Sequence, residues 1–523
     1  MIEKNIIGLE RSALGSKYIQ GFDPAAMQTL PGAFPVATEV EVHLAMQKAW
    51  SAWKSYRHLS GQKKGAFLRA IAEEIENLGP ELIHRAMAES GLPEGRLLGE
   101  RGRTCGQLRL FASVVEEGSW VEAVIDTAQP DRTPAPKPDI RKMLDAVGPV
   151  VVFTASNFPL AFSTAGGDTA SALAAGCPVI VKAHESHPGT HALVAEAIQK
   201  AAQNTGMPDG VFSSLYGSGF WLGETLVKHP LTRAVAFTGS HQGGKALFDL
   251  AIQREEPIPV FAEMGSINPI FLLPEKIRLH TETLASQIAG SVNLGAGQFC
   301  TNPGLLVCID KDYTPGFVEA LKAGFAAQTL QTMLNPGIHR NFSAGKDQML
   351  QKPGIQIEFA DAGAETALTA SPTIASVSGT EFLKNPDMQQ EIFGPFSLLV
   401  RCSDRRELEQ VAESLNGQLT ATIMGLPEEL PEYASLAQTL REKSGRLVFN
   451  GVPTGVEVCP AMHHGGPYPA TTDSRFTSVG TGAIKRFVRP VAFQDCPEIL
   501  LPNALQDKNP LGIWRMRDGV WTR

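Results

Sequence analysis

Two short apolar segments, Val147-Gly148-Pro149-Val150-Val151-Val152-Phe153 and Pro178-Val179-Ile180-Val181-Lys182, decide the fold expected for this chain of 523 residues. Each segment is rich in valine or isoleucine, has the length of one strand, and begins next to Gly or Pro, which predicts a strand buried on both faces. Between them lies a stretch of small, helix-compatible residues, 159–175. A strand, a helix and a strand in this order predict a parallel sheet with helices packed against it.

The same alternation continues on the carboxyl side, with predicted helices and strands over 191–204, 211–215, 221–228, 234–237 and from about 242. We therefore expect a doubly wound α/β sheet, in which ligands bind beyond the carboxyl ends of the strands. On the amino side, Thr38-x-x-Glu41 forms a capping-box pattern at the start of a helix. Further amphipathic helices are predicted over 63–78, 80–90 and 96–116.

A second α/β segment follows, with predicted strands at 269–273, 305–309, 396–400 and 446–450. Four prolines within the polar stretch 126–140 predict an extended arm, and 484–493 reads as its partner strand. The chain is thus expected to form two α/β domains, a β arm and an uninterpreted C-terminal tail. The first domain comprises 1–125 with 148–259, and the second comprises 260–460. The arm comprises 126–147 with 484–495, and the tail comprises 496–523.

Composition excludes several classes of protein. The formal net charge of −8 argues against a nucleic-acid binder, which would carry a basic face. The seven cysteines are odd in number and lack C-x-x-C pairs, so we expect no metal site and no disulfide framework. No apolar run approaches the ~20 residues of a membrane-spanning helix, and the N-terminus lacks a signal pattern. A cytoplasmic protein with no membrane partner is expected.

One cysteine lies in a loop of small residues, Gly295-Ala296-Gly297-Gln298-Phe299-Cys300-Thr301-Asn302-Pro303-Gly304. Gly and Pro on both sides block regular structure, so the backbone displays the thiol, as a nucleophile requires. Taken alone, the loop also fits a buried, inert cysteine, because free cysteines are among the most buried residues.

Other motifs give this loop a context, and together they resemble those of the aldehyde dehydrogenase superfamily over nearly the whole chain. The motifs are Asn157-Phe158-Pro159, Lys182-x-x-Glu185, Phe237-Thr238-Gly239-Ser240, Glu263-Met264-Gly265, Glu391-x-Phe393-Gly394-Pro395 and Phe449-Asn450. Within the superfamily, 102–111 and 465–475 resemble the branch of 2-oxoglutarate semialdehyde (2,5-dioxopentanoate) dehydrogenases and bacterial NADP-linked fatty aldehyde dehydrogenases.

The resemblance implies three catalytic residues. The Cys300 thiolate would add to the aldehyde, and the Asn157 amide with the Cys300 backbone N–H would stabilise the resulting oxyanion. Glu263, in an otherwise apolar stretch, is expected to have a raised pKa and to activate water as a general base. Ser266 departs from the family pattern, which usually has a second glycine after Gly265.

The resemblance also implies a site for NAD or NADP. A turn between a strand and a helix would bind the pyrophosphate, a second group would bind the adenosine ribose, and a third would hold the nicotinamide ribose. A carboxylate at position 185 repels a 2′-phosphate, which favours NAD, while Lys182 and the NADP-linked relatives leave dual use open. The pyrophosphate group comprises Thr238, Gly239, Ser240 and Gly244. The adenosine ribose group comprises Lys182 and Glu185, and the nicotinamide ribose group comprises Glu391 and Phe393.

Four residues are candidates for contact with the aldehyde substrate. Arg103 would pair with a distal carboxylate, although a solvated arginine fits the same pattern. His464 would tune Cys300, and the remaining two candidates are Phe158 and Phe299. We expect oxidation of 2-oxoglutarate semialdehyde to 2-oxoglutarate by a homodimer or homotetramer. The alternatives are a medium- or long-chain aldehyde dehydrogenase, a non-catalytic nucleotide-binding protein of this fold, and a thiol hydrolase or acyltransferase.

Overall fold

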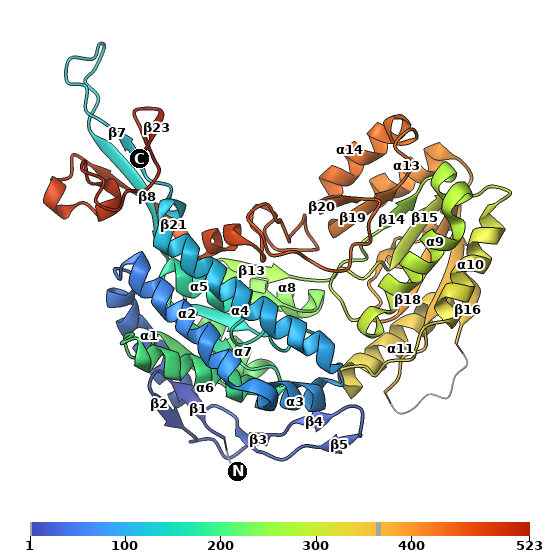
Figure 1. Cartoon of the computed structure of the whole chain (residues 1–523), viewed down its shortest axis with the longest axis horizontal. Helices are drawn as coiled ribbons and strands as arrows, with labels where there is room; N and C mark the ends of the chain where they lie inside the picture. The colour runs from blue at the N-terminus through green and yellow to red at the C-terminus, as the bar shows by residue number, and fades with distance from the viewer. Residues whose placement is uncertain (1–2, 362–367) are drawn as a thin grey trace.

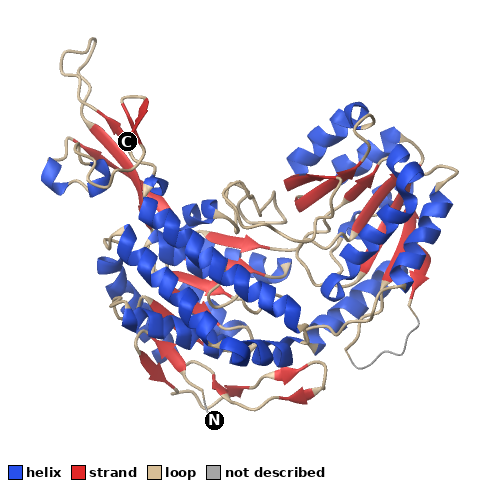
Figure 2. Ribbon diagram, viewed as in Figure 1, coloured by secondary structure: helices blue, strands red, loops and turns tan. Residues whose placement is uncertain are grey.

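The computed structural model describes residues 3–361 and 368–523, which form two α/β units and a projecting arm (Figure 1). In both units helices cover the faces of a central sheet (Figure 2). This arrangement confirms the predicted fold class. In the part of the chain that is described, no helix combines the length and the apolar character needed to cross a bilayer.

The sheet of the first unit contains seven strands, of which five are parallel. Two N-terminal strands extend its edge in the antiparallel sense. The expected domain boundary at 260 lies too early, because residues 260–263 pair with a strand of this first sheet. In spatial order the strands are β13 (Val260–Glu263), β12 (Ala234–Thr238), β9 (Val150–Phe153), β10 (Val179–Lys182), β11 (Phe212–Leu215), β1 (Asn5–Ile7) and β2 (Glu10–Ser12).

Strand β9 shows why this sheet is buried on both faces. Val150 and Val152 belong to one hydrophobic cluster, whereas Val151 and Phe153 belong to another on the opposite face. Each buried side chain of this size contributes roughly 1.5–3 kcal/mol. The covering helices are α1 (Glu39–Tyr56), α2 (Gly61–Asn77), α3 (Gly79–Ser90), α4 (Glu94–Glu117), α5 (Gly167–Ala175), α6 (Pro188–Asn204), α7 (Phe220–Lys228) and α8 (His241–Ile252).

Two details of these helices bear on the predictions. The capping box of Thr38 and Glu41 is present at the start of α1, as predicted. Residues 159–175 are helix-compatible in sequence, but the observed helix is shorter than this range, because α5 begins only at Gly167. The residues before it form a loop at the carboxyl end of β9, and this loop carries Asn157.

The second unit also has a seven-stranded sheet, parallel except for its edge strand β16. The spatial order is β16 (Gln356–Ala360), β17 (Thr373–Ser378), β18 (Phe396–Cys402), β15 (Leu305–Ile309), β14 (Ile270–Leu272), β19 (Gln418–Met424) and β20 (Ser444–Phe449). The helices are α9 (Pro274–Asn293), α10 (Thr314–Ala326), α11 (Pro336–Leu350), α12 (Gly379–Lys384), α13 (Arg405–Ser414) and α14 (Ala434–Lys443).

The arm contains five strands, and residues 496–523 are part of it rather than a separate tail. Leu505 and Ile513 pack with Ile125 in its small core, and Arg141 donates to the Leu505 carbonyl at 2.7 Å. The terminal strands are only three residues long, so their sequences show no recognisable period. Strand β22 pairs with β7, and β23 pairs with β22. The spatial order is β21 (Val488–Gln494), β8 (Ile140–Ala146), β7 (Val124–Asp126), β22 (Arg515–Arg517) and β23 (Val520–Thr522).

The long segment after β20 returns from the second unit to the first (Figure 1). The Met264 N–H donates to the Ala470 carbonyl at 2.8 Å, and the Ala262 N–H donates to the Thr472 hydroxyl at 3.0 Å. This contact brings residues 463–478 against the end of β13, beside the Cys300 loop.

Candidate active site

The Cys300 loop begins where α9 ends and turns through three consecutive left-handed residues, Gly295, Ala296 and Gly297. A Cβ atom on Gly297 would lie 2.2 Å from the backbone of Gly394, so this position requires glycine. The loop therefore docks on the Glu391–Pro395 segment. Cys300 is partly exposed and lines a cavity of about 420 Å³, within the usual range for ligand pockets.

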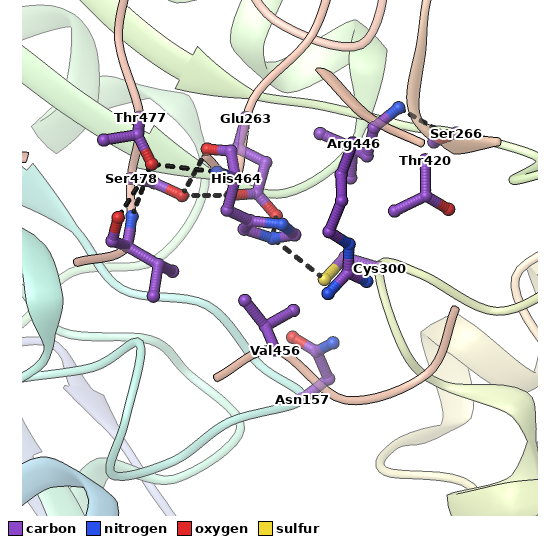
Figure 3. Close-up of polar contacts among 12 residues, drawn as sticks. Asn157, Glu263, Ser266, Cys300, Thr420, Arg446, Val456, His464, Thr477 and Ser478 are labelled. Atoms are coloured by element: carbon purple, nitrogen blue, oxygen red, sulfur yellow. Dashed lines mark hydrogen bonds and ion pairs between the residues drawn. The ribbon is translucent and has the colours of Figure 1, made fainter. Parts of the chain in front are cut away.

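Side chains from distant parts of the chain gather around this thiol (Figure 3). The Cys300 Sγ lies 3.5 Å from the Nε2 of His464, and the same nitrogen lies 2.9 Å from the Oε1 of Glu263. Ser478 donates its hydroxyl to the other carboxylate oxygen at 2.7 Å. Because a carboxylate only accepts, we assign the His464 proton to Nε2.

Hydrogen bonding fixes the charge of Glu263. Burial alone would raise its pKa, but His464 and the hydrogen bonds that reach the carboxylate together hold the pKa below its ordinary value. The expectation of a raised pKa was therefore wrong, since several donors surround this buried carboxylate. In contrast, burial and the nearby Glu263 charge raise the pKa of the Cys300 thiol well above its ordinary value. At rest the site pairs a neutral thiol with a carboxylate.

Asn157 is buried in the loop after β9 and lines the cavity with Cys300. Its amide nitrogen donates to the Gln298 carbonyl at 3.0 Å, which links it to the Cys300 loop. An amide has a second N–H to offer. Ser266, the departure from the family pattern, donates to the Gln418 side chain at 2.9 Å and accepts the Leu419 N–H at 3.0 Å, so the hydroxyl is accommodated by β19.

The cavity collects most of the predicted cofactor residues. Helix α8 begins at its edge, with the Ser240 hydroxyl accepting the N–H of Gly243 at 3.2 Å. A helix N-terminus of this kind favours phosphate groups. On the opposite side, burial raises the pKa of Glu391 to about 7. The predicted residues that line the cavity are Thr238, Gly239, Ser240, Glu391 and Phe393.

Three predicted cofactor residues lie outside this cavity lining. A Cβ on Gly244 would meet the Met264 sulfur at 2.8 Å, so this glycine permits α8 to pack on β13, and Gly243 faces the cavity instead. Lys182 lies at the end of β10, 4.0 Å from the carboxylate of Glu185. Glu185 accepts the Gly219 N–H at 3.0 Å and is exposed.

Helix α4 presents two arginines to the other side of the thiol. Arg96 lies 4.5 Å over the rings of both Phe158 and Phe299 and donates to the Asn157 carbonyl at 3.3 Å. Its charge is offset by Glu100 at 3.5 Å. Arg103 is half-buried rather than solvated, lies over Phe162, and donates to the Val456 carbonyl.

A third arginine, Arg446 from β20, lies beside Cys300 (Figure 3). Sequence reasoning missed it, although a charge at the start of an apolar strand was a visible signal. It also missed Ser478, for which the sequence carries no local signal.

Glu263, Cys300 and His464 place ligand-type atoms within 4.8 Å of one another. The arginines around this thiol oppose a cation there, and the three groups already satisfy each other. We therefore assign them to proton handling rather than to metal binding.

The comparisons with known proteins agree with this geometry. Residues 11–467 match the model of the aldehyde dehydrogenase family. The chain is 50% identical over 515 residues to alpha-ketoglutaric semialdehyde dehydrogenase 2 of Azospirillum brasilense, with 98% of each protein covered. It is 46% identical over 521 residues to the alpha-ketoglutaric semialdehyde dehydrogenase of Acinetobacter baylyi, with 99% of each covered.

The fold has close counterparts among solved structures. Aldehyde dehydrogenase 21 of Physcomitrella patens, determined with the reaction product succinate, matches with a TM-score of 0.80 at 18% identity, covering 94% of this chain and 98% of that chain. The chain therefore belongs to the aldehyde dehydrogenase family, the NAD(P)-dependent oxidoreductases that its motifs resemble.

Proposed function

We propose that this protein oxidises 2-oxoglutarate semialdehyde (2,5-dioxopentanoate) to 2-oxoglutarate. The observation that carries the proposal is the Cys300–Glu263–His464 group, with a partly exposed thiol and two buried partners, beside arginines on the other side of the thiol. The two relatives with 46–50% identity, both named for this substrate, support it.

The first step is activation of the thiol. Glu263, a carboxylate at rest, accepts the Cys300 proton as the sulfur adds to the aldehyde carbon. As the proton leaves the sulfur, the N–H of His464 turns from the Glu263 oxygen toward the sulfur, 3.5 Å away, and stabilises the negative charge that develops there until the C–S bond forms. Ser478 continues to hold the other oxygen of Glu263 at 2.7 Å.

The second step needs stabilisation of the tetrahedral adduct. We assign this to the free N–H of the Asn157 amide and to the Cys300 backbone N–H, and losing one such donor typically costs about 10²–10³ in rate. A bound nicotinamide cofactor would supply the acceptor for the hydride of this adduct. Gly239, Ser240 and the N-terminus of α8 would hold the cofactor phosphates, and Glu391 its nicotinamide ribose.

The last step is hydrolysis of the thioester on Cys300. Glu263, after returning its proton to solvent, takes one from the attacking water. Its low pKa keeps it in the basic form at neutral pH.

Two finer features belong to the same proposal. Glu185 favours NAD over NADP, since a carboxylate repels a 2′-phosphate. The arm is proposed to pair subunits in a homodimer or homotetramer, because β21 lies at the edge of its sheet.

The test is the rate of reduced-cofactor formation with 2,5-dioxopentanoate and with plain aliphatic aldehydes of increasing length, each with NAD and with NADP. A clear preference for 2,5-dioxopentanoate supports the proposal. Faster oxidation of long-chain aldehydes would instead favour a fatty aldehyde dehydrogenase. Ester hydrolysis without any cofactor-dependent aldehyde oxidation would identify a thiol hydrolase, and the absence of both activities would leave a non-catalytic binding protein.

A further inference from the structure

We infer that Arg446 determines specificity by binding the 2-oxo acid end of the substrate together with Arg103. This inference rests on the proposed function and names a residue that no sequence motif assigned. Arg446 lies on β20 and Arg103 on α4, so the two cations come from different units of the fold.

One loop holds both guanidinium groups. Arg446 donates to the Pro453 carbonyl at 2.6 Å and to the Gly455 carbonyl at 3.1 Å. Arg103 donates to the next carbonyl along, that of Val456. Since consecutive carbonyls are close in space, the two guanidinium groups lie near each other around the loop 453–456.

Among the residues that the structure describes, neither guanidinium group is held in an ion pair, although Glu100, Glu263 and Glu457 are near enough to Arg103 to oppose the lowering of its pKa by burial. Within residues 3–361 and 368–523, Arg103 and Arg446 form no ion pair with a carboxylate, in contrast to Arg96, which pairs with Glu100. The carbonyls that hold them carry no net charge. Buried donors also remain without a hydrogen-bond partner in the described part of the chain, namely Nε and Nη2 of Arg103 and Nε of Arg446. Buried donors of this kind are costly unless a ligand satisfies them.

Both side chains lie close enough to Cys300 to act on its charge. Figure 3 shows the Arg446 guanidinium beside the sulfur, with Val456 and Asn157 nearby. A substrate whose aldehyde reacts at Cys300 would therefore place its distal end among these donors.

The chemistry of the donors selects the group that binds. A 2-oxo acid offers a carboxylate and an adjacent carbonyl oxygen in one plane, which matches the planar fork of a guanidinium. Two forks can bind the carboxylate and the 2-oxo oxygen together. An aldehyde with the same carboxylate but no 2-oxo group would satisfy fewer of these donors.

The test compares three aldehydes of equal chain length: 2,5-dioxopentanoate, 5-oxopentanoate and pentanal. We expect Arg446→Leu to lower the preference for 2,5-dioxopentanoate over pentanal by about 10–100-fold, mainly through KM, because a charge-assisted hydrogen bond is lost. Arg446→Lys keeps the charge without the fork and should lose less. Arg441→Leu, an exposed arginine of α14, is the matched control and should retain the wild-type preference.

A binding measurement separates this inference from the proposed function. We expect 2-oxoglutarate to slow alkylation of Cys300 by iodoacetamide in the wild type, glutarate to slow it less, and Arg446→Leu to abolish the difference. Arg446→Gln repeats the measurements if Arg446→Leu fails to fold, as judged by its thermal unfolding.

Two results would contradict the role of Arg446 or the proposed substrate. If Arg103→Leu loses the substrate preference while the Arg446 variants keep it, the role of Arg446 is overturned and the proposed function stands. If the wild type oxidises pentanal equally well, the proposed substrate is wrong, and protection by 2-oxoglutarate then decides whether Arg446 binds the anion.

Discussion

The polar groups on the two sides of Cys300 have different sources. One side, the cofactor-facing wall, lines the cavity, and the other, the substrate-facing wall, is made by arginines that lie outside the cavity lining. The first consists of a strand-to-helix turn, Thr238–Ser240, and the Glu391–Phe393 segment. Its polar groups are the backbone groups and hydroxyls of the turn, whose positions the turn itself sets, and the Glu391 carboxylate. The second consists of long side chains, Arg103 and Arg446, held by carbonyls of a distant loop.

This difference has a physical consequence for specificity. A wall of backbone groups binds what every dinucleotide shares, the phosphates, and a side-chain change alters it little. In a wall of long side chains, a single substitution can change the charge while the chemistry at Cys300 is retained. Glu263 lines the cavity and contacts His464, which lies 3.5 Å from the Cys300 sulfur, so variants at these two residues should alter the chemistry at Cys300 itself.

Cys300→Ala removes the group on which both walls converge. We expect cofactor-dependent oxidation of every aldehyde to fall by about 10⁴-fold or more, as for other enzymes that lose their nucleophile. The measurement is the rate of reduced-cofactor formation, with cofactor binding followed by quenching of tryptophan fluorescence as the control. Turnover within tenfold of the wild type would contradict the assignment.

Glu263→Gln keeps the shape of this side chain but cannot accept a proton. Thioester hydrolysis should slow by about 10²–10⁴-fold, the usual contribution of a general base. Rapid-mixing experiments would follow a burst of reduced cofactor against steady turnover. Because Glu263 also receives the Cys300 proton, both the burst and the steady rate should fall, and an unchanged burst would assign thiol activation to another group.

His464→Phe tests the cause of the low Glu263 pKa. Without His464, burial dominates and the Glu263 pKa rises. A general base works when deprotonated, above its pKa, so the acid limb of the kcat profile should move to higher pH and activity below neutral pH should fall by about tenfold or more. Ser478→Ala, which removes one donor to the same carboxylate, should move the limb less. An unshifted profile in His464→Phe would show that His464 does not set this pKa.

Glu185→Ser alters a predicted cofactor residue that lies outside the cavity lining, and it should have the smallest effect. Removing the carboxylate should raise kcat/KM for NADP relative to NAD by about tenfold, since the charge is exposed and screened by solvent. The preference among aldehydes should stay as in the wild type. An unaltered cofactor ratio would show that Glu185 does not reach the ribose, consistent with its place outside the cavity lining.

The comparison of the walls also explains which predictions succeeded. The predicted strands at 150–153 and 179–182 are present, because runs of buried β-branched residues specify strands locally. The N-terminal cap of α8 at Ser240 is equally local. The role of Gly244 stays a prediction, because a glycine in sequence does not reveal whether its Cα faces a ligand or, as here, the Met264 side chain.

The amino-acid sequence was sufficient to predict the two α/β units, the thiol on an irregular loop and the family resemblance. Only the tertiary structure decided that His464 contacts Glu263, 201 residues away, and that this contact lowers rather than raises the carboxylate pKa. It likewise decided that Arg446 lies beside Cys300 and that residues 515–522 complete the arm. The physical reason is that backbone propensities act over a few residues, whereas convergence of side chains and pKa shifts depend on long-range packing.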